Sequence, residues 1–427
     1  MLTFYSIARA RSIMAVATWR FECFWFLVSM AYPGALGISL QDLATSNLQG
    51  GASPQSKTIA LSARSSFPQD AGTLSPGCHA LQRFVVSNNE DEVRQACESI
   101  ATTVQQHLDN KDLAATCLSL VQPILNDPQR GPWLAKTRVQ EAIMEFVKRY
   151  ADDREVQWNA VFLVGGGYGV PQAVTLRTSQ LGGFTHLFSV IKHFDSDVEM
   201  QMQTWRSLSD PSYTVSGANT IANEGGTYEG IRFMVQQMEA HTDGHQAVGA
   251  QDHLDLLYEI MQVAGGILSM NRREYAPVFW QEGFTSQIVH AMEVEQDLRG
   301  TQDVACKCMS RLAAEVRPAA VDLMDRGAVE LMKNAMDTFH DYDATPFVMG
   351  HTLGNEYPVV PNCAQTLKAM AVAAPKKAKM LMIQAGLEGT LASVRPDMLS
   401  GETLIDGFFQ GLQVRSDVSY LLKFIRE

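Results

Sequence analysis

The sequence predicts an all-helical protein in which repeated helical units stack into one elongated array. From about His79 onward, apolar residues recur at i, i+3, i+4 and i+7, which is the spacing of amphipathic helices. No alternating run with hairpin turn signals indicates a strand, and the short apolar run at 161–164 continues a helical pattern. A chain of 427 residues is too long for one ordinary compact core, whereas a stacked array has no such limit.

The charge balance argues against nucleic acid as a partner. The chain has 34 basic and 46 acidic side chains and a formal net charge of −12. Residues 1–69 carry a net charge of +3, so the rest of the chain carries −15. Because binding to phosphates requires an excess of Lys and Arg on some face, we expect no nucleic-acid partner. An acidic surface instead favours a basic or apolar segment of a partner protein.

Residues 1–37 have the pattern of a targeting leader. Three arginines precede an uncharged apolar stretch, which Pro33 and Gly34 interrupt before it is long enough to span a membrane. Ala35-Leu36-Gly37 supplies the small residues of a cleavage site. The pattern predicts secretory or endomembrane targeting by a cleaved or anchoring signal, or targeting to an organelle. A gene-model extension or a buried helix of a cytoplasmic protein stays open, and contact with a membrane is expected only through an uncleaved leader.

Composition divides the remainder of the chain into three parts. Residues 38–78 are rich in Ser, Gly, Gln and Pro and cannot bury much apolar surface, so they are predicted to form a disordered linker. Residues 79–398 carry the amphipathic helices. Residues 399–427 alternate polar with apolar helix residues and are predicted to cap the array.

A degenerate repeat organises residues 79–398. Each unit cannot bury its apolar face alone, so the units are expected to stack. A first mark is a glycine ahead of a helix, which permits a sharp turn between units. This mark occurs at Gly183-Phe184, Gly230-Ile231, Gly283-Phe284, Gly327-Ala328 and Gly386-Leu387. A second mark is a helix with small residues late in its length, which let neighbouring helices approach. We anchor this helix on Val156, Val198, Leu254, Val304 and Cys363.

These residues resemble the armadillo (ARM) repeat. The resemblance is carried by residues 181–188 followed by residues 197–201, and by residues 302–308 leading to residues 326–329. It covers roughly residues 80–400 and identifies the superfamily, not a member. It implies a right-handed α-solenoid of armadillo/HEAT-like repeats, each a short helix followed by two longer ones. The excess over the typical repeat length is expected in insertions at 209–229, 241–253 and 340–361.

No motif in the sequence assembles a catalytic, cofactor or metal site. The glycine-rich run at 165–169 lacks the spacing of a phosphate loop and is interpreted as a helix end. His241, His245 and His253 could chelate a metal, but a glycine separates the first two, and a solvated loop is the expectation. Residues 340–351 lack the spaced acids of a calcium loop. We therefore predict no catalytic residue, no cofactor, no metal and no enzymatic activity.

The seven cysteines, an odd number, do not suggest a disulfide framework. Cys306 and Cys308 are two residues apart on a predicted helix, so their side chains point to different faces. We expect Cys308 to be a buried, apolar cysteine.

The resemblance implies a non-catalytic scaffold that recognises a partner protein through the concave groove of the solenoid, lined mainly by the last helix of each unit. Nuclear-import receptors of this family carry Trp and Asn on those helices, which Trp158-Asn159 and Trp205 resemble in part. The other units lack this pattern, so import cargo is not expected. We predict that Trp158, Trp205, Arg206 and Arg311 bind the partner, with core packing as the alternative for the two tryptophans.

Two other functions stay open on the sequence alone. One is an assembly or structural subunit of an organellar or membrane-associated complex, which differs from the scaffold in its location. The other is an enzyme whose site is carried by an inserted loop, which no constellation of nucleophile, base and orienting group supports.

Overall fold

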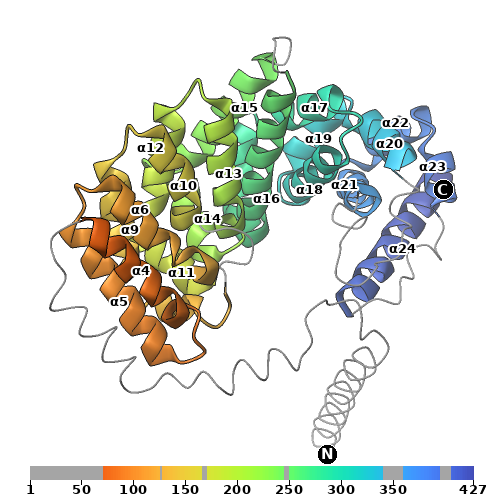
Figure 1. Cartoon of the computed structure of the whole chain (residues 1–427). Helices are drawn as coiled ribbons and strands as arrows, with labels where there is room; N and C mark the ends of the chain where they lie inside the picture. The colour runs from red at the N-terminus through yellow and green to blue at the C-terminus, as the bar shows by residue number, and fades with distance from the viewer. Residues whose placement is uncertain (1–70, 126, 166–170, 245–249, 340–358, 395–404) are drawn as a thin grey trace, which may run out of the picture. The chain divides into compact units, whose positions relative to one another are not determined.

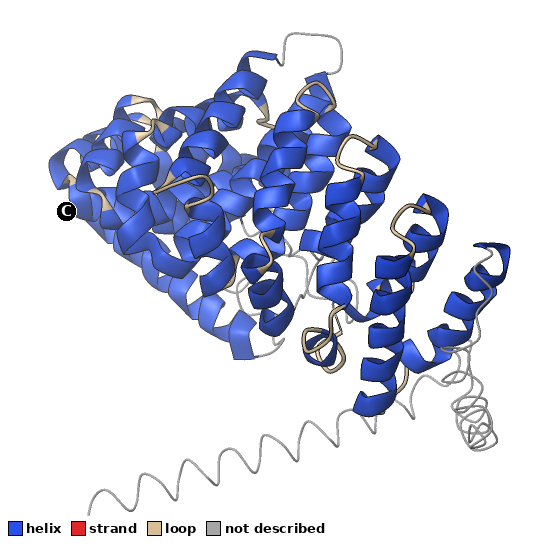
Figure 2. Cartoon of the chain, turned by 90° about the vertical axis from the view of Figure 1, so that its left-hand side faces the viewer, coloured by secondary structure: helices blue, strands red, loops and turns tan. Residues whose placement is uncertain are grey.

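The computed structural model describes residues 71–125, 127–165, 171–244, 250–339, 359–394 and 405–427. The chain divides into two units, residues 1–66 and 67–427, and all the described helices belong to the second. The described residues form helices, turns and no strand, which confirms the all-helical prediction (Figure 2). The predicted leader and most of the predicted linker lie outside the described residues. Among these residues, no helix has both the length and the apolar character needed to cross a membrane.

The described helices follow one another in sets of three, which we call repeats 1 to 7 (Figure 1). Repeat 1 consists of α4 (Ala71–Val85), α5 (Glu90–Gln106) and α6 (Lys111–Ser119). After the short α7 (Gln122–Leu125), repeat 2 consists of α8 (Gly131–Leu134), α9 (Val139–Arg149) and α10 (Arg154–Gly165). Repeat 3 consists of α11 (Gln172–Gln180), α12 (Gly183–His193) and α13 (Val198–Ser212).

Repeats 4 and 5 are joined by one long helix. Non-helical backbone at Asn271 divides α16 (Ala250–Gln281) between repeats 4 and 5. Repeat 4 consists of α14 (Val215–Ala222), α15 (Glu229–Gly244) and the first part of α16. Repeat 5 consists of the rest of α16, α17 (Phe284–Val294) and α18 (Arg299–Glu315). Repeats 6 and 7 are α19 (Arg317–Asp325), α20 (Ala328–Phe339) and α21 (Val359–Ala373); and α22 (Pro375–Gln384), α23 (Leu387–Ser393) and α24 (Ile405–Arg426).

The third helices form a row in which α10, α13, α16, α18, α21 and α24 each pack on the next. Glycines late in two of these helices allow the close approach. A Cβ atom on Gly165 would lie 2.5 Å from the carbonyl oxygen of Ser207, and one on Gly266 would lie 1.8 Å from the hydroxyl of Ser212. Such distances leave no room for a side chain, in line with the predicted role of small residues.

A residue in the left-handed conformation precedes the second helix of repeats 3 to 7. In four of these repeats it is a glycine: Gly182, Gly283, Gly327 and Gly386 have φ values of 75°, 86°, 82° and 71°, and the last three are the glycines that the sequence predicts. In repeat 3 the turn therefore falls on Gly182 and not on the predicted Gly183. Because this region of φ is open to glycine without steric cost, the turn is sharp at little energetic expense.

Repeat 4 departs from this pattern. Tyr228, with φ of 62°, takes the place of the turn glycine, and its N–H donates to Asn223 Oδ1 at 3.1 Å. The glycine that the sequence pattern marks, Gly230, has another role: a Cβ there would lie 1.8 Å from the carbonyl oxygen of Ile221. Gly230 is therefore required by close packing of α15 on the end of α14 and not by a turn.

A buried glutamine recurs at the start of three third helices and shows which residues are equivalent. Gln157, Gln201 and Gln302 each lie in the first turn of their helix, at the same distance from the residue that precedes it. Each donates through Nε2 to carbonyl oxygens at the end of the preceding helix. The predicted anchors Val156 and Val198 are thus out of register. Val156 corresponds to Met200, since both donate their N–H to the capping aspartate before their helix.

The segment 209–229, predicted to be an insertion, is instead part of two repeats. It contains the end of α13 and the whole of α14, the first helix of repeat 4. Gly217 permits the tight approach of α14, because a Cβ there would lie 2.1 Å from the carbonyl oxygen of Pro211. Its Gly and Asn content suggested a loop, but packing outweighs local preference here. The segment 241–253 is helical at both ends, and residues 340–358 lie outside the described part.

The expectation about cysteines is wrong in one respect. Cys78 is joined to Cys117, and Cys306 to Cys363, with Cα atoms 5.3 Å and 5.0 Å apart. An odd number of cysteines excludes only complete pairing, and the partners are 39 and 57 residues apart, on helices that the fold brings together. Cys78 belongs to α4, which begins within the predicted linker. Cys308 is free and buried, as predicted.

Candidate binding groove

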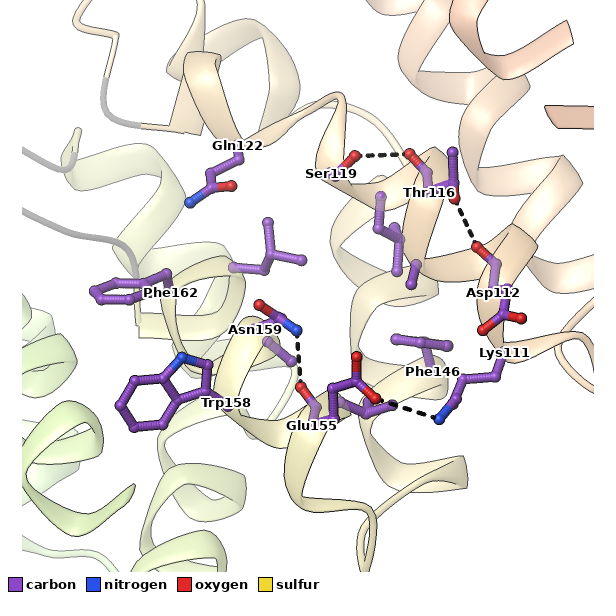
Figure 3. Close-up of a pocket in the computed structure, with 15 residues that line it drawn as sticks. Lys111, Asp112, Thr116, Ser119, Gln122, Phe146, Glu155, Trp158, Asn159 and Phe162 are labelled. Atoms are coloured by element: carbon purple, nitrogen blue, oxygen red, sulfur yellow. Dashed lines mark hydrogen bonds and ion pairs between the residues drawn. The ribbon is translucent and has the colours of Figure 1, made fainter. Parts of the chain in front are cut away.

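A cavity of about 480 Å³ lies between α6 and α10, and we call it the α6–α10 groove (Figure 3). Figure 3 shows Lys111, Asp112, Thr116 and Ser119 on the α6 side. Trp158, Asn159 and Phe162 lie on the α10 side, as Figure 3 also shows. The groove is therefore formed by third helices of two successive repeats, which is the kind of surface that the sequence predicts as the binding face.

The predicted binding residue Trp158 lines this groove. Its side chain is half-buried, and the guanidinium carbon of Arg154 lies 5.4 Å from its ring centroid. The next residue, Asn159, is exposed and donates from Nδ2 to the Glu155 carbonyl oxygen at 2.9 Å. Phe162, one turn further along α10, adds a second partly exposed ring. Two aromatic rings and an amide thus share the α10 side of the groove.

The charged groups of the groove leave an excess of carboxylate. Lys111 is its single basic lining residue, and its Nζ lies 3.1 Å from Asp153 and 3.8 Å from Glu155. The hydrogen bond to Asp153 raises the pKa of Lys111, so the amine stays charged and engaged. Glu155 is 81% exposed and Asp112 is exposed. With two carboxylates and one engaged cation, the lining favours a positively charged ligand.

Arg154 repeats the relation of Lys111 one repeat later. Its Nε lies 2.5 Å from Asp197 Oδ2, and its Nη2 lies 2.9 Å from Glu199. Each of these basic residues opens its third helix and pairs with the aspartate that caps the next third helix. The hydrogen bond from Arg154 lowers the pKa of Asp197. These ion pairs join neighbouring third helices, and the ring of Trp158 lies against Arg154.

Arg206 and Arg311, the two predicted binding arginines, are each engaged within the protein. Arg206 donates from Nε to Glu259 at 2.7 Å, where burial raises the pKa of the carboxyl group. The Arg206 side chain is 41% exposed, so one side of it faces solvent. Arg311 is half-buried and donates from Nη1 to the Gly265 carbonyl oxygen at 2.9 Å. Neither arginine lines the α6–α10 groove.

Trp205 is a core residue, so its prediction as a binding residue is corrected. Its side chain is fully buried and packs on Phe233, 6.2 Å away between ring centroids, and on Phe188, 5.7 Å away. These rings come from α15 and α12, which cover this face of α13. Trp205 lies eight residues after its capping aspartate, whereas Trp158 lies five after Asp153, so the two tryptophans are not equivalent and lie about 60° apart around their helix axes.

The sequence reasoning missed Lys111, Asp112, Glu155 and Phe162, which line the groove. A signal for Lys111 is present. A basic residue opens α6 and again α10, and each is followed about one repeat later by an aspartate that caps the next third helix. Reading the basic residue and the cap together would have placed the groove and the correct register.

Two buried histidines in successive repeats each form a hydrogen bond with a glutamine of the preceding repeat. His186 Nε2 lies 2.8 Å from Gln157 Oε1, and His241 Nε2 lies 3.2 Å from Gln201 Oε1. Burial lowers the pKa of each imidazole to about 4. Within the described residues, no group of three or more His, Cys, Asp or Glu could hold a metal ion. The glycine-rich residues 166–170, His245 and residues 340–351 lie outside that part.

Comparisons with known proteins identify no family. No family model matches the chain, and no curated protein matches it. Three crystal structures of engineered proteins from the Northeast Structural Genomics Consortium are similar to it. Target OR366 is 16% identical over 67% of this chain and 98% of its own, with a TM-score of 0.49. Target OR329 is 17% identical over 67% and 96%, with a TM-score of 0.47. Target OR497 is 17% identical over 86% and 97%, with a TM-score of 0.40.

Proposed function

We propose that this chain is a non-catalytic, armadillo-type scaffold that binds a basic segment of a partner protein in the α6–α10 groove. The observation that carries the proposal is the placement of Trp158 and Asn159 beside an excess of carboxylate. An exposed aromatic ring with an amide next to it suits an extended peptide, because the ring packs on aliphatic stems and the amide bonds to peptide groups.

The armadillo assignment is supported by the organisation of the repeats. Each of repeats 3, 5, 6 and 7 has a left-handed glycine before its second helix, and third helices pack on one another in chain order. A right-handed solenoid built in this way would place the third helices on its concave face. The α6–α10 groove would then be one segment of a longer binding surface.

The charge of the groove supports a basic partner over an acidic one. Glu155 and Asp112 present carboxylates to solvent, and Lys111 is engaged by Asp153. A Lys or Arg side chain of the partner would pair with these carboxylates and lie against the ring of Trp158. An acidic segment would meet repulsion at the same place.

A binding titration with designed peptides tests this proposal. The full-length protein is titrated into fluorescein-labelled peptides of equal length that are rich in Lys and Arg, in apolar residues, or in Asp and Glu, and fluorescence anisotropy is recorded. We expect the basic peptide to bind and the acidic peptide not to bind. Equal binding of the acidic peptide, or no binding of any of them, would contradict the proposal.

Charge reversal localises the interaction. The double variant Asp112→Lys and Glu155→Lys is expected to weaken binding of the basic peptide at least tenfold, about 1.4 kcal/mol or more. The matched control is the double variant Glu239→Lys and Glu330→Lys, which reverses two exposed carboxylates, on α15 and α20, away from the groove lining. Circular dichroism of both variants confirms that the helices are retained. If both variants weaken binding equally, the effect comes from net charge and not from the groove.

A further inference from the structure

Two histidines from separate helices are brought face to face in repeat 4. His241 lies near the end of α15 and His253 near the start of α16, and their Nδ1 atoms are 2.9 Å apart. The two rings are tilted by 34°, with centroids 5.2 Å apart. The sequence offered His241, His245 and His253 as possible metal ligands, of which the first two have helical spacing, and predicted a solvated loop. The pair that the fold assembles is instead one that helical spacing does not indicate.

The contact with Gln201 determines which ring nitrogen of His241 carries the proton. The amide of Gln201 donates from Nε2 to the carbonyl oxygens of Phe194, at 3.4 Å, and of Asp195. Its Oε1 is therefore an acceptor, so His241 Nε2, 3.2 Å away, carries a hydrogen. A neutral imidazole with its proton on Nε2 has its lone pair on Nδ1, where it accepts the N–H of His253 Nδ1 at 2.9 Å. That lone pair points to His253.

The same glutamine contact in repeat 3 serves as an internal comparison. His186 pairs with Gln157 through Nε2 at 2.8 Å, which shows that the contact itself is a packing feature of the repeats. What distinguishes repeat 4 is the second imidazole opposite Nδ1. The feature to be explained is therefore the pair, and not the glutamine contact.

We propose that His241 and His253 bind one zinc ion through their Nδ1 atoms. Imidazole nitrogen is a preferred zinc ligand, at Zn–N distances of about 2.0–2.1 Å, which places two ligand nitrogens of a tetrahedral ion about 3.3–3.4 Å apart. His253 is half-buried, so its ring can move outward by the few tenths of an ångström required. Its proton moves from Nδ1 to Nε2 on binding, which frees the second lone pair for the ion. The N–H of His241 on Gln201 is the outer contact that orients zinc-bound histidines. The two remaining positions of the ion are left to water or to an incoming donor.

Zinc titration of the full-length protein tests the site. Protein freed of metal by chelation is titrated with zinc chloride and followed by calorimetry. We expect one ion to bind per chain and His253→Gln to weaken that binding roughly tenfold or more, because one of two protein ligands is lost. The matched control is His290→Gln on α17, a half-exposed histidine beside Glu293, which is expected to bind zinc like the unaltered protein.

A spectroscopic readout separates this site from a plain hydrogen bond between two neutral imidazoles. In nitrogen-detected magnetic resonance, zinc is expected to shift the Nδ1 signals of two histidines in the unaltered protein. This readout needs no variant, so it holds even if His253→Gln fails to fold. No zinc binding in the micromolar range, unchanged affinity in His253→Gln, or imidazole signals that ignore zinc would each overturn the proposal. The result is independent of the proposed binding groove.

Discussion

Arg154, the first residue of α10, reaches across to Asp197, the residue that caps α13 in the next repeat. The distance from Arg154 Nε to Asp197 Oδ2 is 2.5 Å, while Asp197 Oδ1 accepts the N–H of Met200 at 3.0 Å. One carboxylate therefore caps its own helix and holds the preceding third helix. Lys111 and Asp153 stand in the same relation one repeat earlier, at 3.1 Å. The stack is thus tied together repeat by repeat at the ends of its third helices.

Asp197→Ala is expected to lower the free energy of unfolding by about 1 kcal/mol, because the helix loses its cap as well as the ion pair. Arg154→Ala is expected to have a smaller effect, since the Arg154 side chain is about half-exposed and the cap is retained. Urea unfolding followed by circular dichroism measures both. The control is Arg94→Ala, an exposed arginine on α5, which should change little. A larger loss for Arg154→Ala than for Asp197→Ala would contradict this order.

Gln157→Leu is expected to destabilise the protein by about 3 kcal/mol. Gln157 is fully buried, and its Nε2 donates to the Val147 and Tyr150 carbonyl oxygens at 2.8 Å each. Leucine fills similar space but leaves these carbonyls and His186 without their partner, at a cost of about 1–3 kcal/mol for each buried group. Gln95→Leu on the exposed face of α5 is the control for the change of residue type. Equal unfolding midpoints for the two variants would show that the buried amide contributes nothing.

Sequence reasoning predicted the helical fold and three of the turn glycines but not the alignment between repeats. Gly283, Gly327 and Gly386 are recognisable because a left-handed turn nearly demands glycine. Trp205 was misassigned because an apolar residue on a solenoid helix can face a groove or the core. Whether the residue faces the groove or the core depends on its position relative to the residue that caps the helix. In a degenerate repeat, the sequence does not identify that capping residue clearly. The partner of Cys306 lies on another helix, 57 residues away, so no local pattern indicates it.

Stability is expected to fall as the pH rises from about 4.5 to 7 on account of Glu295. Burial, with Asp255 adding to it, raises the pKa of this carboxyl to about 7 from 4.5, so the folded protein binds more protons than the unfolded chain in that range. The loss levels off above about pH 7 and amounts to about 3 kcal/mol at most. Glu295→Gln removes a charge that the fold must bury, so it should stabilise the protein at pH 8 and not at pH 4.

Urea unfolding at the two pH values measures this difference. Glu293→Gln, two residues earlier and about half-exposed, serves as the control and is expected to leave the pH dependence unchanged. If Glu295→Gln and the unaltered protein lose stability in parallel over this range, another group is responsible.

The two disulfides give a prediction about oxidised and reduced protein. After alkylation under denaturing, non-reducing conditions, peptide mass spectrometry is expected to find Cys78 linked to Cys117 and Cys306 linked to Cys363, with Cys97 and Cys308 alkylated. Cys363→Ser is expected to lower the free energy of unfolding by up to about 4 kcal/mol, the chain-entropy value for a closed loop of this length. Alkylation of all four paired cysteines in protein prepared under oxidising conditions would contradict the pairing.

The most direct test of the central claim is the affinity of the Lys- and Arg-rich peptide for the Trp158→Ala variant. Trp158 lines the α6–α10 groove, so removal of its ring is expected to weaken binding at least tenfold while the unfolding midpoint changes little. Trp133→Ala, which removes a half-buried ring of α8 outside the groove lining, is expected to bind the peptide like the unaltered protein. Unchanged affinity in Trp158→Ala, or equal loss in both variants, would contradict the account.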